Sequence, residues 1–194
     1  MQGLALLLAM VLLVPPISGV ATVFDASSGE VVGSWSVNGS IPVEPSPHLV
    51  AFVSTPRALY VLNLSSERVS TEGRSVVINS SNGAPLYIVV GKARVEVSTP
   101  QHLVLSGLCV VVEAPKSIQV DGVYYTLKAL YVNETKVSGT EARVCSGTVY
   151  AVYDPIPWWM YPENAVIIAI VVGAAAAAGI YVARPRRRAV VVYA

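Results

Sequence analysis

The longest apolar run in the chain, Ala165–Ala183, constrains the fold more than any other feature. It holds nineteen residues without a charged side chain or a proline, and Tyr181 is its only polar side chain. A helix of about 20 apolar residues spans the hydrocarbon core of a bilayer, where every backbone polar group must be paired within the segment. The sequence therefore predicts one C-terminal transmembrane α-helix at residues 165–183.

The flanks of this run set its orientation. Four arginines follow it at once, and the positive-inside rule places them in the cytoplasm. Aromatic side chains precede it, where amphipathic rings gather beside lipid headgroups; a ligand-stacking platform is the other interpretation of the two tryptophans. The predicted membrane-interface residues are Trp158, Trp159, Tyr161, Arg184, Arg186, Arg187 and Arg188. We therefore expect the preceding chain to lie outside the plasma membrane and the C-terminus to be cytoplasmic.

Small residues in the same run point to helix packing. Gly173 and Ala177 are spaced four apart, which allows the backbone of another helix to approach closely. The alternative is a plain anchor, because alanine is a good helix former. The sequence thus predicts a protein partner either at this helix or at the outer domain.

A shorter apolar segment stands at the start of the chain. Leu4–Val14 holds eleven apolar residues, followed by Pro15, Pro16 and small residues up to Ala21. Such a segment is too short to span comfortably and is typical of a signal peptide, with cleavage after Gly19 or Ala21. No lysine or arginine precedes it, so an uncleaved signal anchor is the alternative. We expect the exported domain to begin near residue 22.

The charge distribution excludes one class of partner. Thirteen basic and twelve acidic residues give a formal net charge of +1. Without the four tail arginines, nine basic residues remain against twelve acidic ones, a net charge of −3. Nucleic-acid binding requires a basic face. The sequence therefore indicates no nucleic-acid partner, and the arginines are expected to face the membrane lipid bilayer.

The region before the helix has the pattern of β-strands. Lys92–Val97 alternates apolar and charged side chains. Ile118–Val120 and Val123–Leu127 flank Asp121-Gly122, a strong signal for a two-residue hairpin turn that would pair Val120 with Val123. The other predicted strands are Thr22–Asp25, Val31–Val37, Leu49–Ser54, Ala58–Leu64, Ser75–Asn79, Leu86–Val90, Leu103–Leu105, Leu108–Glu113, Lys128–Val132, Ala142–Cys145 and Thr148–Tyr153.

Many short strands at this spacing predict an all-β domain, an antiparallel β-sandwich whose architecture could be immunoglobulin-like. A barrel and two very small β units are the alternatives. The core tryptophan that immunoglobulin domains place between two distant cysteines is missing, because Trp35 precedes both cysteines.

Two further patterns fit an exported domain. Cys109 and Cys145 are the only cysteines, and outside the cell we expect them to form a disulfide; free thiols or half a metal site are the alternatives. Four of the six asparagines stand in glycosylation sequons, although turns also enrich Asn and Ser together. The predicted acceptors are Asn38, Asn63, Asn79 and Asn133.

Motifs for catalysis or cofactor binding are missing from the sequence. The only histidines, His48 and His102, have no cysteine or histidine at metal-ligand spacing. No nucleophile motif and no phosphate-binding glycine loop occurs. We therefore predict no enzymatic activity, no cofactor, no metal and no small-molecule substrate; an exported enzyme tethered to the membrane is the least supported alternative.

Together these patterns predict a type I single-pass membrane protein with a binding or envelope-structural outer domain. The alternative is a non-catalytic accessory subunit of a transporter, secretion or respiratory complex, docked through its helix. The predicted segments are a signal peptide at 1–21, an extracellular domain at 22–154, a stalk at 155–164, the helix at 165–183 and a tail at 184–194.

Overall fold

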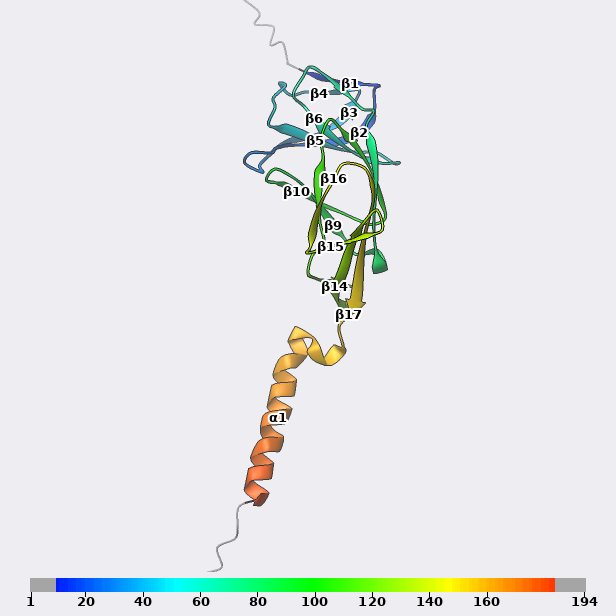
Figure 1. Cartoon of the computed structure of the whole chain (residues 1–194). Coiled ribbons are helices and arrows are strands. Elements are labelled where there is room, and N and C mark those ends of the chain that lie inside the picture. The colour runs from blue at the N-terminus through cyan, green and yellow to red at the C-terminus, as the bar shows by residue number, and fades with distance from the viewer. Residues whose placement is uncertain (1–9, 184–194) are drawn as a thin grey trace, which may run out of the picture.

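The structure, a computed structural model, describes residues 10–183 of the 194-residue chain, without the side chains of Ala165 and residues 177–183. The chain forms a β-rich domain followed by one long helix, α1 (Pro162–Ala183), which extends away from it (Figure 1). The expectation of an all-β domain is confirmed. We refer to residues 11–155 as the β-domain.

One large mixed sheet runs through the whole β-domain. It has ten strands, nine of which lie on one path while β15 pairs only with β14. In spatial order they are β13 (Ser117–Val120), β14 (Val123–Val132), β17 (Gly147–Pro155), β8 (Arg74–Ser80), β11 (Gln101–Ser106), β6 (Leu59–Asn63), β5 (Leu49–Ser54), β2 (Ser18–Asp25) and β3 (Val31–Asn38), with β15 at Thr135–Val137.

Two smaller sheets pack against the large one. A four-stranded sheet has the order β10 (Ala93–Val97), β9 (Leu86–Val90), β12 (Val110–Glu113) and β16 (Glu141–Val144). A three-stranded sheet has the order β4 (Ser40–Ile41), β1 (Val11–Val14) and β7 (Arg68–Ser70), at the end of the domain far from α1 (Figure 1). Two short 3-10 turns, η1 (Ser81–Gly83) and η2 (Trp158–Met160), complete the described elements.

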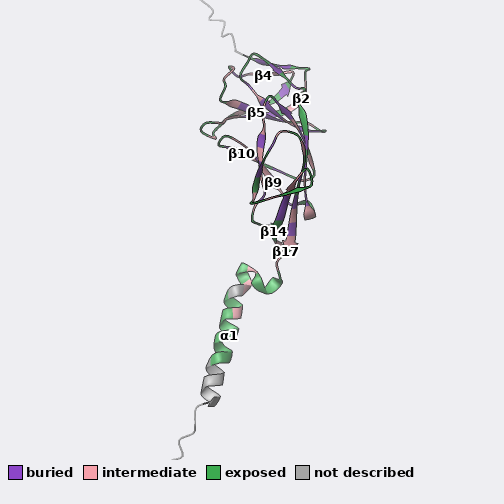
Figure 2. Ribbon diagram, in the orientation of Figure 1, coloured by how far each residue is buried: buried purple, intermediate pink, exposed green. Residues whose placement is uncertain are grey.

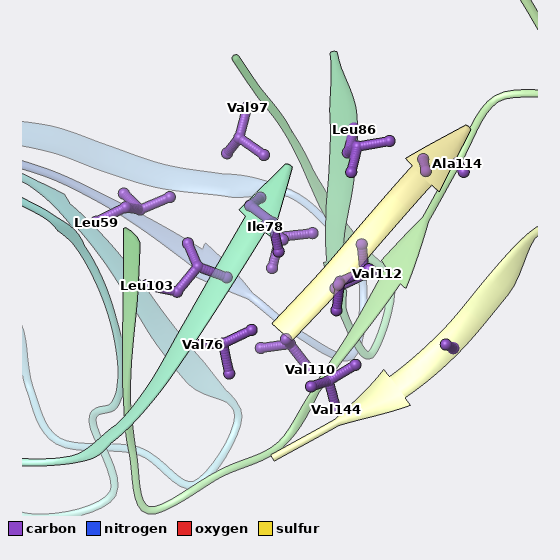
Figure 3. Packing of buried hydrophobic residues seen from close by; sticks show 14 of the residues in the cluster. Leu59, Val76, Ile78, Leu86, Val97, Leu103, Val110, Val112, Ala114 and Val144 are labelled. Carbon is purple, nitrogen blue, oxygen red and sulfur yellow. The ribbon is translucent and has the colours of Figure 1, made fainter. Parts of the chain in front are cut away.

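The small sheets cover opposite faces of the large sheet. In β5, Val50 and Phe52 belong to one buried cluster, whereas Ala51 and Val53 belong to the other. Alternate residues of a strand point to opposite faces, so the two clusters are separate cores on the two sides of one sheet. The first core lies under the four-stranded sheet and includes Leu103 (Figure 3), and the second lies under the three-stranded sheet. Figure 2 shows both as buried segments along the domain.

Local sequence signals predicted one hairpin to the register. The Asp121-Gly122 turn joins β13 to β14 with Val120 opposite Val123, as expected. Asp121 and Gly122 both have positive φ, 49° and 78°, the left-handed conformation that this type of turn requires. The strands expected at 123–127 and 128–132 form one strand, β14, interrupted by a register shift between Leu127 and Ala129.

Other parts of the fold differ from the expectation. Two of the three sheets are mixed, because β6 with β11 and β8 with β17 pair in parallel in the large sheet, and β1 with β7 in the three-stranded sheet. The four-stranded sheet is antiparallel throughout. The antiparallel sandwich is therefore corrected to three sheets, two of them mixed, in which the large sheet contributes to two cores. The short strands β4, β7 and β15 were not predicted, since a two- or three-residue strand has too few positions to show alternation. Nor was β1, and the strands begin at Val11 rather than at residue 22.

The disulfide is confirmed. Cys109 and Cys145 are bonded, with their Cα atoms 4.4 Å apart. Cys109 directly precedes β12 and Cys145 directly follows β16, and Val110 lies opposite Val144 in the adjoining pair of the ladder. The bond therefore joins the ends of two neighbouring strands, one of which is the edge of the four-stranded sheet.

Candidate functional site

The junction between the β-domain and α1 carries exposed aromatic rings. β17 leads into η2, whose Trp158, Trp159 and Met160 are all exposed. The two indole rings meet edge to face, with centroids 6.1 Å apart. Three large apolar side chains are thus presented next to the start of α1, where the sequence predicted aromatic rings at lipid headgroups.

Several polar contacts attach this junction to both neighbours. The Asn164 side-chain amide donates to the Trp158 carbonyl oxygen over 2.8 Å, and the Ile156 N–H donates to the Tyr124 carbonyl oxygen over 2.7 Å. The Tyr124 and Tyr161 rings meet with centroids 4.7 Å apart. Loss of solvent around Tyr124, together with its hydrogen bond to Glu163, raises the pKa of the Tyr124 hydroxyl. The β13–β14 hairpin therefore holds the turn that leads into α1.

The helix α1 exposes apolar side chains around its circumference. Val166, Ile167, Ile170, Val171 and Val172 are each exposed by 60% or more, at positions that span two turns. An apolar hollow of about 300 Å³ opens between Trp158 and the first turns of the helix. Among the residues whose side chains are described, no helix has both the length and the apolarity needed to cross a membrane.

The two predicted packing residues of the helix are only partly described. Nothing lies within 4 Å of where a Cβ of Gly173 would stand, so this position is open. Ala177 falls where side chains are outside the description, and Arg184, Arg186, Arg187 and Arg188 lie beyond the described residues. The packing prediction and the charge prediction for the tail therefore stay predictions.

A second candidate surface lies on the large sheet, on the face that the three-stranded sheet covers only in part. Five neighbouring strands contribute to this face, and their registers place the outward side chains opposite one another in three rows that cross the strands. We name it the tyrosine face; its residues are Tyr60, Ser75, Val77, Asn79, His102, Val104, Tyr131, Thr148 and Tyr150. Val77 is 42% exposed and Tyr150 41%. Apolar area on an outward sheet face is a feature of contact surfaces.

The outer face of the four-stranded sheet is different in character. The Arg94 guanidinium lies 3.7 Å from the centre of the Tyr87 ring and forms a 3.0 Å ion pair with Glu113. The Tyr87 hydroxyl donates to Glu96 over 3.2 Å. Its loss of solvent and the charge of Glu96 raise the pKa of Tyr87. This face is a network of charged groups that satisfy one another, as expected of a solvated surface.

The four sequon asparagines differ in exposure. Asn38 and Asn133 are exposed, whereas Asn63 and Asn79 are half-buried. The Asn63 Oδ1 atom is buried and has no hydrogen-bond partner among the described residues. Asn133 Oδ1 accepts from the Thr148 N–H over 2.8 Å, which holds the turn after β14. The structure thus makes Asn38 and Asn133 the more accessible acceptors.

Asn79 belongs to the tyrosine face. It lies opposite Tyr150 in the register of β8 and β17, and its Oδ1 atom accepts from the Ser80 N–H over 2.8 Å. A glycan on Asn79 would stand beside Tyr150 and shield this face. A glycan at this sequon would therefore limit access to the tyrosine face.

The two histidines lie apart and serve different local structures. The His102 Nε2 atom is 2.6 Å from the Ser75 hydroxyl, both on exposed positions of the tyrosine face. His48 lies in the loop before β5, where its N–H approaches the Ser46 hydroxyl at 3.4 Å. Within residues 10–183, no three side chains of His, Cys, Asp and Glu come together in a way that could hold a metal ion.

Sequence reasoning found the junction but missed the tyrosine face. The tryptophans are recognisable from their distance to the apolar run. The tyrosine face comes from β6, β8, β11, β14 and β17, whose order in the sheet no local pattern encodes. The only available signal was an outward tyrosine in each of three predicted strands: Tyr60, Tyr131 and Tyr150.

Comparison of the chain with protein-family models, with curated proteins and with solved structures gives no match.

Proposed function

We propose that this protein is a membrane-anchored surface protein whose β-domain lies outside the cell and contacts another envelope protein. The observation that carries this proposal is α1, a helix whose apolar side chains are exposed on every described side and which extends away from the β-domain. Exposed apolar area of this extent needs either lipid or protein around it. The complete run at 165–183 has the length of a membrane span.

The flanking residues support the orientation. The exposed tryptophans of η2 suit the headgroup layer on the outer side, and the four arginines after the helix suit the cytoplasmic side. Asn164 and the contact between Tyr124 and Tyr161 join η2, α1 and the β-domain. The β-domain would then stand close to the membrane rather than on a long linker.

The topology has a direct test, because all four lysines of the chain lie in the β-domain and all are exposed: Lys92, Lys116, Lys128 and Lys136. A membrane-impermeant amine reagent is added to intact cells that express the full chain, and labelled lysines are identified by mass spectrometry. We expect labelling without permeabilisation. Labelling of these lysines only after the membrane is opened would contradict the outward orientation.

Anchoring is tested by alkaline extraction of the membranes. Full-length protein should stay in the pellet, and Ile170→Asp should release it because a charge within a span is unfavourable. The matched control Ile170→Ala keeps the position apolar and should stay in the pellet. Equal behaviour of the two variants would count against α1 as the anchor.

For the contact role, the tyrosine face is the best-supported surface, since it combines exposed apolar and aromatic groups. Full-length protein is purified in mild detergent with its co-purifying proteins. Tyr150→Ser should lose an envelope partner, whereas Tyr87→Ser, on the charged face of the four-stranded sheet, should keep it. Retention of the partner by both variants would exclude the tyrosine face as the contact.

The second candidate function is that of an accessory subunit in a larger membrane complex. It is favoured by the open surface at Gly173, where a neighbouring helix backbone could approach closely. Gly173→Leu should disrupt such a complex, while Ala175→Leu, on the opposite side of the helix, should not. A stoichiometric membrane partner that is lost only in the first variant would select this function over the surface module.

A further inference from the structure

The strand β1 completes the three-stranded sheet at the end of the domain. It pairs antiparallel with β4 on one side and parallel with β7 on the other, and β4 and β7 do not pair with each other. The Leu13 N–H donates to the Gly39 carbonyl oxygen over 2.9 Å, and the Leu12 N–H donates to the Glu67 carbonyl oxygen over 2.6 Å. Without β1 this sheet does not exist.

Side chains of β1 alternate between core and solvent. Val11 is 0% exposed and Leu13 is 2% exposed, whereas Leu12 and Val14 are exposed by 43% and 52%. The two buried side chains belong to the second core, together with Ile41, Val43, Leu64 and Val69. An apolar segment that serves only as a leader has no reason to bury every second side chain in the mature domain.

The residues that follow β1 are equally integrated. β2 starts at Ser18 and pairs with β3 on one side and, from Val20, with β5 on the other. Ala21 is completely buried, and Gly19 passes so close to the Ser54 carbonyl oxygen that a Cβ would not fit. The connection between the two strands is fixed by Thr71, whose hydroxyl donates to the Pro15 carbonyl oxygen over 2.7 Å.

From these contacts we infer that residues 11–21 are a permanent part of the mature domain, so that any proteolytic processing site lies at or before Met10. Cleavage after Gly19 or Ala21 would remove β1 and the first part of β2. It would leave β4 and β7 without a common partner and uncover the second core. This inference is independent of the proposed function, because it concerns the domain in any location.

The sequence pattern alone could not show this. Leu4–Val14 is apolar at every position, so its outward residues are as apolar as its buried ones, and no alternation is visible. Only the partners of β1, which come from residues 40–41 and 68–70, distinguish a strand from a leader.

The decisive experiment reads the N-terminus of the mature wild-type protein. The first glutamate of the chain is Glu30, and the first sequon is Asn38, so a glutamate-specific protease releases an N-terminal peptide without a glycan site. Full-length protein is purified in mild detergent, its free amines are blocked, and the peptide ending at Glu30 is identified by mass spectrometry. A peptide that begins at or before Val11 supports the inference. A peptide that begins between residues 12 and 25 overturns it.

A matched pair of substitutions gives a second, independent measurement. Leu12 and Leu13 have the same side chain and adjacent positions, so Leu12→Ser and Leu13→Ser should affect the function of a leader equally. In the strand β1 the two positions differ, because Leu13 is buried and Leu12 is exposed. We expect Leu13→Ser to lower the midpoint of thermal unfolding by about 10 °C, or to reduce the yield of folded protein, with little change for Leu12→Ser. Equal effects of the two substitutions on midpoint and yield would overturn the inference.

Discussion

Removal of the disulfide should have a large and calculable effect on stability. The bond closes a loop with a sequence separation of 36 residues. Constraint of the unfolded chain by a loop of this length corresponds to about 3–4 kcal/mol. The double substitution Cys109→Ala/Cys145→Ala removes this constraint, and it also frees the end of β16, which contributes Ala142 and Val144 to the first core. We therefore expect the unfolding free energy to fall by about 3–4 kcal/mol.

The measurement is guanidinium unfolding of the full-length protein in mild detergent, followed by the circular dichroism of the β-domain. Wild-type protein with reductant should match the double variant without reductant. Both should show a steeper denaturant dependence than the oxidised wild type, because the unfolded chain without the crosslink is less compact and exposes more surface. A loss below about 1 kcal/mol in both samples would refute the reasoning that the bond acts through loop closure.

Three further predictions follow from single side chains. Burial raises the pKa of Tyr153 to about 12 from its usual 10.0, so the folded state holds this proton more tightly than the unfolded state. The contribution of Tyr153 to stability should be constant below pH 10 and should fall by about 2 kcal/mol as the pH rises toward 12. In unfolding curves recorded across that range, Tyr153→Phe should make the loss of stability smaller by about this amount. Leu103 is completely buried in the first core (Figure 3). Leu103→Ala should lower the free energy of unfolding in guanidinium by about 2–5 kcal/mol. A decrease under about 1 kcal/mol would argue against this packing. Lys128 and Asp154 form a 2.9 Å ion pair, and both side chains are largely in solvent. Lys128→Ala should therefore leave the unfolding midpoint unchanged within error. A clear shift of the midpoint would show that this ion pair contributes to stability.

Much of the local structure could be predicted from the sequence. The hairpin at Asp121-Gly122 was predictable to the register, because turn chemistry and apolar alternation agree there. The disulfide was predictable because only two cysteines are present and both were expected outside the cell, so one pairing is possible. The hairpin signal lies within a few neighbouring residues, and the disulfide prediction depends only on the number of cysteines.

The arrangement of strands could not be predicted in the same way. Parallel pairs such as β8 with β17 join segments about 70 residues apart, and the sequence of neither strand indicates which strand it pairs with. The tyrosine face depends on these pairings, because His102 and Tyr131 come from different strands of the large sheet. Sequence reasoning could therefore identify the junction at Trp158 but not the second candidate surface.

The sequence by itself determined the character of each segment: short β-strands, one disulfide, and a long apolar run preceded by tryptophans and followed by arginines. Only the tertiary structure decided what the first apolar segment does. The hydrophobic effect is non-directional, so apolar composition alone suits a leader and a core strand equally well. Backbone pairing with β4 and β7, and the burial of Val11 and Leu13, gave that segment a definite place in the fold.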